Sequence, residues 1–401
     1  MNEHDTMSVL QSDIVIPEIV QKKANMAFQK IHETNTIDSK EQTNIRTEKR
    51  RKPRMRKRGV IIFVAAAVLA LGSITVLAAY QNWSKSLSED LQISEEQKEE
   101  LQEDGAVAFA MQSQTQNGVT VTAQQSITDN YFAHLSFRVE GYDLPKDAQE
   151  NYLEPCFEYI HITVDGGTDY NMSGSFFDGL VIGPEGRVVY ADGSPIDYDA
   201  PGSLSRYVQD DGSLEFLITL SDSKGNKGYF LNKEICVEFE NLGTVSKAEY
   251  HKEHEVTGKW RFQWNLQGSD SMKAYTLNEP LGDTGATVVK AEISPISMHV
   301  EYNFPYQTYI ETGLDQDGNP IESVQMVEAP PLAGVKLKDG TIYQYLCGGG
   351  SEGYRADDRN TYIATYANER VIDTEQVESL IFRKMVDGMY SDSDFYFVPV
   401  N

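Results

Sequence analysis

The sequence predicts a mainly β protein with two extracytoplasmic β-sandwich-like domains, one transmembrane helix and a short cytoplasmic helix. Three observations predict this class. From residue 106 onward, apolar and polar residues alternate in short runs, as in strands that bury one face. Ahead of these runs, residues 60–79 carry no charge and follow a basic cluster. Nearer the N-terminus, residues 16–31 place apolar side chains at helical spacing.

Residues 1–58 predict a cytoplasmic segment with one amphipathic helix over residues 16–32. Pro17 suits a first helical position, and Glu18 complements the positive end of the helix dipole. A helix of this length is marginal alone in water, so its apolar stripe needs a partner. A groove on another protein fits best; the membrane surface and a solvated helix without a partner are the alternatives. The predicted partner-binding residues are Ile16, Ile19, Val20, Ala24, Phe28 and Ile31.

Residues 59–80 predict a transmembrane helix. At about 1.5 Å per residue, the uncharged run VIIFVAAAVLALGSITVLAA would span roughly 30 Å, the thickness of a bilayer's hydrocarbon core. Eight of the ten residues 49–58 are Lys or Arg, and the positive-inside bias places such a cluster in the cytoplasm. We therefore predict a single-pass signal-anchor protein of the cell membrane, with its N-terminus cytoplasmic and its C-terminus outside. The predicted membrane-flanking residues are Arg54, Arg56, Lys57, Arg58, Tyr80 and Trp83.

A cleaved secretory signal is the alternative to an anchor, because Val76–Ala78 offers the small residues that a signal peptidase accepts. Signal peptides, however, have a short basic region and an apolar stretch of about 7 to 15 residues. Here 59 residues precede an apolar run of 20. Both lengths favour the anchor.

The net charge of −26 combines two unlike parts. Residues 1–58 hold 13 of the 35 Lys and Arg and 8 of the 61 Asp and Glu, a net charge of +5. Residues 81–401 hold the other 22 and 53, a net charge of −31. An outer region this acidic repels nucleic acid, so we expect no nucleic-acid partner. Cations and basic proteins are the ligands that its charge favours.

Residues 81–104 predict an acidic juxtamembrane stalk. Ser94 and Gln97 fit a helix capping box, and Gly105 suits the end of the helix. Because apolar residues are sparse, we expect this stalk to be solvated and open to proteases. Its few large apolar residues include Leu87, Leu91 and Leu101.

Residues 105–268 predict the first β domain. Two alternating runs, GVTVTAQQSITD and YFAHLSFRVE, meet at Asp129-Asn130 and predict a hairpin. Further strand-like runs are FEYIHITVD, LEFLITL, EICVEFE and GKWRFQWNL. The last of these places one apolar face toward a core, made of Trp260, Phe262, Trp264 and Leu266.

Residues 269–401 predict a second β domain, in which strand-like runs recur as ATVVKAEISPISMHVEYNF, AGVKLKDGTIYQYL and NERVIDTEQVESLIFRKM. Between them, the stretch DQDGNPIESVQM partly fits a calcium loop. Pro320 stands where that loop needs Gly, and Met326 where it needs Glu. A hairpin loop is the better interpretation.

The sequence offers no strong catalytic or metal-binding motif. It has no phosphate loop and no His-Glu-x-x-His, so it does not indicate an enzyme, a cofactor or a metal. The three cysteines, Cys156, Cys236 and Cys347, each lie in or beside an apolar run and predict buried thiols. A bridge between Cys156 and Cys236 stays open at this point.

Several segments carry a resemblance along most of the chain: IPEIVQKKANMAFQKI, QNGVTVTAQQSITDNYFAHLSFRV, GKWRFQWNL, VVKAEISPISMHVEY and IDTEQVESLIF. On these segments the chain resembles a family of Gram-positive single-pass membrane proteins with an extracytoplasmic domain of unknown function. That resemblance implies an anti-sigma-factor-like regulator, whose inner helix holds a sigma factor while its outer region senses an unknown ligand or protein. The His-x-x-x-Cys-x-x-Cys module of many anti-sigma factors is absent, so sigma binding would rest on the helix alone. The alternative is a cell-surface binding or structural protein with an inert cytoplasmic tail.

Overall fold

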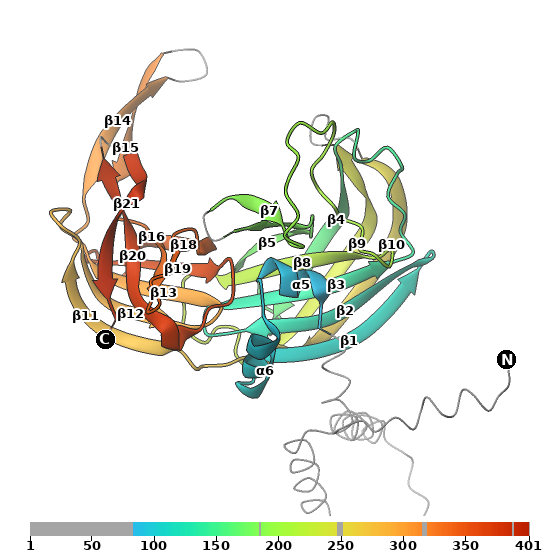
Figure 1. Cartoon of the computed structure of the whole chain (residues 1–401), viewed down its shortest axis with the longest axis horizontal. Coiled ribbons are helices and arrows are strands. Elements are labelled where there is room, and N and C mark those ends of the chain that lie inside the picture. The colour runs from blue at the N-terminus through green and yellow to red at the C-terminus, as the bar shows by residue number, and fades with distance from the viewer. Residues whose placement is uncertain (1–82, 184–185, 247–251, 315–318, 387–388, 401) are drawn as a thin grey trace, which may run out of the picture. The chain divides into compact units, whose positions relative to one another are not determined.

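The computed structural model describes residues 83–183, 186–246, 252–314, 319–386 and 389–400 (Figure 1). This part of the chain is mainly β, which confirms the predicted class at that level. The predicted inner helix, its basic flank and the predicted span lie outside the described residues. Within the described part, no helix has the length and apolarity to cross a membrane.

Two helices precede a first pair of sheets, which we call the first sandwich. The helices are α5 (Lys85–Asp90) and α6 (Glu95–Glu103). The strands that follow are β1 (Val107–Gln116), β2 (Val119–Thr128), β3 (Phe132–Glu140), β4 (Leu153–Val164), β5 (Tyr170–Phe176), β6 (Leu180–Ile182), β7 (Val188–Tyr190), β8 (Leu214–Asp222), β9 (Glu234–Ser246) and β10 (Lys252–Asn265).

The first sandwich packs a five-stranded sheet, in the order β1-β2-β3-β8-β5, against a three-stranded sheet, β10-β9-β4. The predicted hairpin is confirmed, since β2 and β3 pair antiparallel around residues 129–131. Alternate residues of both sheets form one core, in which the rings of Phe137 and Phe239 meet at 4.8 Å from opposite sheets. The predicted apolar face of the GKWRFQWNL run is confirmed too, because all four of its side chains lie in this core.

The second sandwich begins after residue 268. Its elements are β11 (Lys273–Pro280), β12 (Thr287–Ile293), β13 (Ser297–Asn303), β14 (Thr308–Leu314), β15 (Pro320–Met326), β16 (Leu332–Leu337), β17 (Ile342–Tyr343), β18 (Cys347–Tyr354), β19 (Thr361–Asn368), the short 3-10 helix η1 (Thr374–Gln376), β20 (Val377–Val386) and β21 (Met389–Pro399).

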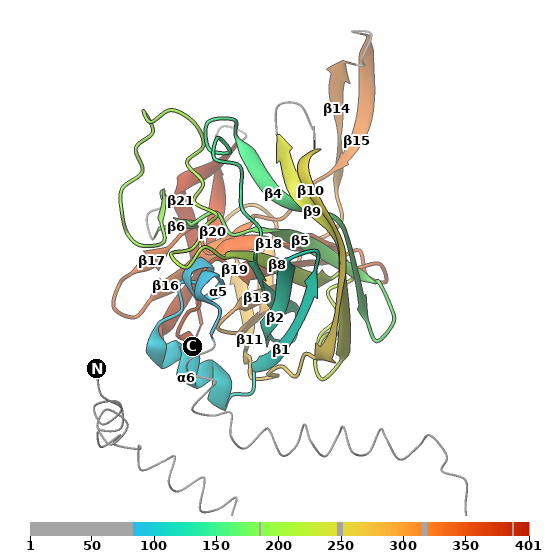
Figure 2. The same cartoon turned by 90° about the vertical axis from the view of Figure 1, so that its right-hand side faces the viewer.

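A five-stranded sheet, β11-β12-β13-β19-β18, faces a four-stranded sheet, β17-β16-β20-β21, in the second sandwich. Tyr302 and Phe382 join the two sheets, with ring centroids 5.8 Å apart, in a core separate from that of the first sandwich. β14 and β15 pair only with each other and project from the sandwich as an arm (Figures 1 and 2). Their pairing confirms the predicted hairpin around residues 315–319.

The predicted solvated stalk is wrong for residues 83–104. The capping box of α6 is present as expected, with Ser94 and Gln97 bonded to each other's backbone. Yet the leucines expected to be wet are buried: Leu87 is 1 % exposed, and Leu91 and Leu101 are each 3 % exposed. They form a small core with Ile127 of β2 and with residues 296 and 371 of the second sandwich. The acidic side chains of α6 are exposed, whereas Glu89 and Asp90 of α5 are half-buried. The two helices are therefore amphipathic with a narrow apolar side.

The joint between the sandwiches is polar and centres on Asp129, which is 3 % exposed. Its carboxylate accepts hydrogen bonds from the backbone N–H groups of Tyr131 and Phe132, at 2.8 and 2.9 Å. It also accepts the hydroxyl groups of Ser294 and Ser297, from the turn between β12 and β13. One carboxylate of the first sandwich thus satisfies four donors, two of them from the second sandwich.

A second set of contacts flanks this carboxylate. The Tyr131 hydroxyl donates to Glu292, and the Lys227 ammonium lies 2.6 Å from the other oxygen of Glu292. The Tyr131 ring stacks on His299, with centroids 4.7 Å apart. Residues from turns of the first sandwich therefore bind directly to β12 and β13 of the second.

The cysteine bridge that the sequence left open is not formed. Cys156 on β4 faces Gly243, whereas Cys236 on β9 faces Thr163. The two cysteines are thus seven positions apart along one ladder, which is beyond the reach of a disulfide. Cys347 carries a thiol as well, and all three side chains are half-buried rather than buried as predicted.

Candidate functional site

The N-terminus of α5 is held against the first sandwich by a buried carboxylate. Glu215 on β8 is 2 % exposed and accepts the Ser84 hydroxyl and the Ser86 backbone N–H, the latter at 3.1 Å. The Ser84 backbone N–H donates to Gln125 of β2 at 2.9 Å, and its hydroxyl also caps the helix by accepting from Leu87 N–H at 3.0 Å. We call the contacts of Glu215 and Gln125 with α5 the latch.

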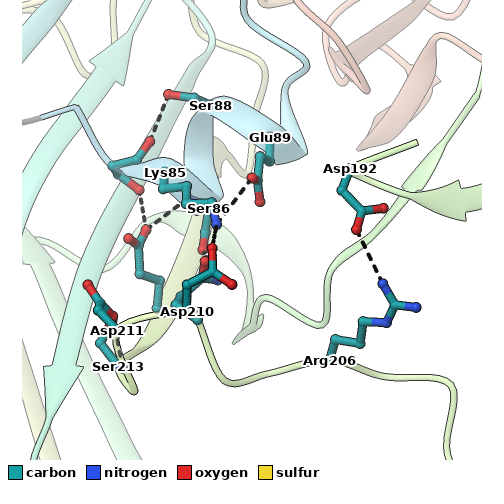
Figure 3. Close-up of polar contacts among 12 residues, drawn as sticks. Lys85, Ser86, Ser88, Glu89, Asp192, Arg206, Asp210, Asp211 and Ser213 are labelled. Carbon is teal, nitrogen blue, oxygen red and sulfur yellow. Dashed lines mark hydrogen bonds and ion pairs between the residues drawn. The ribbon is translucent and has the colours of Figure 1, made fainter. Parts of the chain in front are cut away.

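Charged side chains surround the latch at the surface (Figure 3). Lys85 lies between Glu89, at 3.8 Å, and Asp210, at 3.3 Å. Asp211 pairs with Arg138 of β3 at 2.7 Å. Hydrogen bonds from Ser213, together with this pair, hold the pKa of Asp211 well below its usual range. Because exposed ion pairs contribute little, the buried Glu215 dominates the energetics of the latch.

The segment that follows α5 is fixed to the second sandwich. Val371 N–H donates to the carbonyl of Leu91 at 2.8 Å, and the Gln97 side chain donates to the carbonyl of Val371 at 3.1 Å. Arg370 donates to the side chain of Gln92. The two helices therefore contact both sandwiches.

A pocket of about 510 Å³ lies beside α5, and we call it the acidic pocket because several carboxyl groups line it. Its floor is the outer face of the five-stranded sheet, including His134 and Thr219. Asp90 of α5 borders one side, and Asn368 and Glu369 of the second sandwich border another. Burial, with Glu369 and Asp178 as neighbouring negative charges, raises the pKa of Asp90 to about 7. Burial and the neighbouring carboxylates therefore oppose the ionisation of Asp90.

The raised pKa of Asp90 predicts that the free energy of unfolding depends on pH. The folded chain keeps the Asp90 proton up to about pH 7, whereas an unfolded chain loses it near pH 3.8. The free energy of unfolding should therefore fall as pH rises between those values, because the folded state binds the proton more tightly. In Asp90→Asn this fall should become smaller, as measured by thermal unfolding between pH 4 and pH 8. An unchanged slope in the variant would rule out Asp90 as a source.

A second pocket, of about 640 Å³, lies near the joint. Its charges are mutually paired: Lys290 lies 3.0 Å from Glu301, and Arg355 lies 3.2 Å from Asp357. Such pairing leaves little uncompensated charge for a ligand. The acidic pocket is the better candidate, although no three His, Cys, Asp or Glu side chains in the described ranges are grouped so that they could hold a metal ion.

Of the predicted site residues, only Trp83 is described. Its ring packs on Phe109 at 6.2 Å, with the Lys98 ammonium 5.7 Å from its centroid. The helix residues from Ile16 to Ile31 and the other membrane-flanking residues lie outside the described ranges, so their roles stay predictions. Sequence reasoning missed Glu215 and Asp90 as site residues. The only signal for Glu215 was its outward position in an alternating strand.

The fold and the site define a mainly β protein in which two sandwiches meet at a polar joint and a short helical segment contacts both. Residues 52–141 match the family described as "Domain of unknown function (DUF4179)". Over these residues, the match confirms the expected domain of unknown function. The matched range runs from the basic cluster through the predicted span and both helices to the end of β3.

Other comparisons add little. No curated protein matches the chain. Among solved structures, the chain is similar to "The crystal structure of the conserved domain protein from Bacillus anthracis", with 12 % identity over 73 % of this chain and 88 % of that chain. The TM-score of that match is 0.36, too low to support a conclusion about fold or function.

Proposed function

We propose that the chain is a membrane-anchored signalling protein without catalytic activity, and that it acts as an anti-sigma-factor-like regulator. Its outer sandwiches sense an extracytoplasmic ligand or protein. Its inner helix, residues 16–32, holds a sigma factor in the cytoplasm. The observation that carries this proposal is the position of the latch: α5 is the first described helix after the predicted span and contacts both sandwiches.

The latch supplies a physical route from the outer region toward the predicted membrane segment. Only a few residues separate the end of the predicted span at Tyr80 from Ser84. A change in the sandwiches that weakens the contacts of Glu215 would free α5 and the chain that leads into the membrane. Residues 83–104 would then become accessible to a protease, whereas the docked helices protect them.

The inner helix tests the proposal directly. If its apolar stripe fills a groove, Phe28→Ala and Val20→Asp should each weaken binding of a sigma factor by on the order of 2 kcal/mol or more, as buried anchors do. Capture of the partner on immobilised full-length chain, followed by a binding titration, measures this. Lys22→Ala, on the opposite face, is the control and should bind normally. Equal losses at all three positions would contradict the stripe.

A surface-binding protein with an inert cytoplasmic tail is the second candidate, and the β14–β15 arm favours it. On one face of the arm, Ile310 pairs with Val324 and Leu314 with Pro320. The exposed fractions of Ile310, Val324 and Leu314 are 66, 71 and 71 %. Exposed apolar side chains on an otherwise unpaired hairpin suit an adhesive contact. Capture of no sigma factor by wild-type chain would leave this second function as the better one.

A further inference from the structure

The acidic pocket has a size and shape suited to a small organic molecule. Its volume of about 510 Å³ falls within the range of roughly 300 to 1,000 Å³ typical of small-molecule sites. Apolar side chains such as Phe176 and Leu217 line it together with polar ones such as Ser173 and Ser175. It also combines residues of α5, of the first sandwich and of the second. A molecule bound there would contact all three.

The charge of the pocket is negative on several sides. Asp90, Glu154, Asp178 and Glu369 line it from four different segments, and among the described residues no Lys or Arg lines it. Burial raises the pKa of Glu369 as well as that of Asp90, so an uncompensated negative charge is unfavourable in this environment. A positive charge placed in the pocket would relieve this repulsion.

Two buried polar atoms at the same pocket lack a hydrogen-bond partner. Asn368 is 2 % exposed; its amide nitrogen donates to the carbonyl of Pro295 at 3.1 Å, while its Oδ1 accepts nothing. His134 is 3 % exposed; its Nδ1 bonds Thr219 at 3.1 Å, and its Nε2 has no partner. Burial lowers the pKa of His134 to about 4, so the imidazole is neutral at pH 7.

The Oδ1 of Asn368 is an acceptor, and the Nε2 of neutral His134 is a second acceptor in the tautomer whose Nδ1 donates to Thr219. Buried acceptors are normally satisfied, so unsatisfied ones at this pocket indicate a missing donor. A ligand that carries several N–H groups and a positive charge would complement both the acceptors and the carboxylates.

We propose that the acidic pocket binds an organic cation that bears an ammonium or guanidinium group. Binding itself stands on the pocket alone; only its consequence for signalling rests on the proposed function. Asp90 is the last residue of α5, so a cation beside it would hold α5 against the sandwiches. The bound state is therefore the state with the latch closed.

The test uses full-length chain purified in mild detergent and two probes that share a butyl chain, n-butylguanidinium and the uncharged n-butanol. Calorimetry should show saturable binding of the cation, weakened about tenfold or more in the double variant Asp90→Asn, Glu369→Gln. Both changes remove repulsion, so the variant should remain folded. Glu279→Gln, an exposed strand carboxylate outside the pocket, is the matched control.

Hydrogen exchange should slow across residues 85–93 when n-butylguanidinium binds.

Four outcomes would overturn the proposal: no saturable binding of the cation, equal binding by the double variant, equal binding of n-butanol, or exclusive binding of Ca²⁺ in a parallel titration. Protection that appears elsewhere than α5 and the pocket would overturn it as well. Because no sigma factor is present, these results do not depend on the inner helix. Failure of the proposed function would appear instead in the partner-capture experiment.

Discussion

Asp129→Ala is expected to lower the free energy of unfolding by about 4 kcal/mol, the largest effect of any single substitution proposed for this chain. The change leaves four donors without an acceptor: two backbone N–H groups and the hydroxyls of Ser294 and Ser297. Water cannot readily replace the carboxylate, because the residue is 3 % exposed. Asp129→Asn keeps one oxygen acceptor and should lose less.

The positions of the tryptophans allow unfolding of the first sandwich to be followed separately from that of the whole chain. All three, Trp83, Trp260 and Trp264, precede residue 269, so their fluorescence reports on the first sandwich, whereas far-ultraviolet circular dichroism reports on both. In urea, the two signals of the wild-type chain should change together, and in Asp129→Ala they should separate as the sandwiches uncouple. Asp143→Ala, an exposed aspartate of the first sandwich, is the control and should change neither midpoint. Coincident, unshifted transitions in Asp129→Ala would refute the coupling.

Local patterns predicted much of the β structure because each strand buries one face. In the GKWRFQWNL run, alternation alone identified the side chains that enter the core, from Trp260 to Leu266. The capping box at Ser94 and Gln97 is likewise a contact within four residues and could be read directly. Features whose partners are close in sequence were therefore predictable.

The packing of α5 and α6 could not be predicted in this way. Leu87, Leu91 and Leu101 look too sparse for an apolar face, and the surrounding carboxylates are typical of a solvated helix. Their partners include Ile296 and Val371, roughly 200 to 280 residues further along the chain. The spacing of apolar residues within residues 83–104 does not show that these two distant segments pack against the same leucines.

The candidate site illustrates the same limit. Alternation in the LEFLITL strand places Glu215 on the face opposite the core, and an outward glutamate is normally solvated. Here α5 covers that face, so the glutamate becomes a buried acceptor. Sequence could thus predict which face Glu215 occupies but not what covers it. The role of Asp129 was equally hard to predict, because an aspartate in a turn rarely forms the centre of a joint between two cores.

Glu215→Ala is expected to open the latch without unfolding either sandwich. Removing the carboxylate leaves the Ser86 N–H and the Ser84 hydroxyl without their acceptor, and hydrogen bonds to a buried charge contribute roughly 1.5 to 3 kcal/mol each. We expect docking of α5 to weaken by about 3 kcal/mol, which corresponds to roughly 100-fold faster hydrogen exchange across α5. Exchange in the cores of the sandwiches should stay unchanged.

Trypsin gives an independent measure of the same opening, because Lys85 and Lys98 lie in the two helices. Cleavage after these lysines should accelerate in Glu215→Ala, stay intermediate in Glu215→Gln, which retains an acceptor oxygen, and remain at the wild-type rate in Glu279→Ala. If α5 exchanges and is cleaved at the wild-type rate in Glu215→Ala, the latch does not hold the helix. If it opens as expected, the same variant in cells should switch on the genes of the proposed sigma factor without any outer signal, since the helix would already be released.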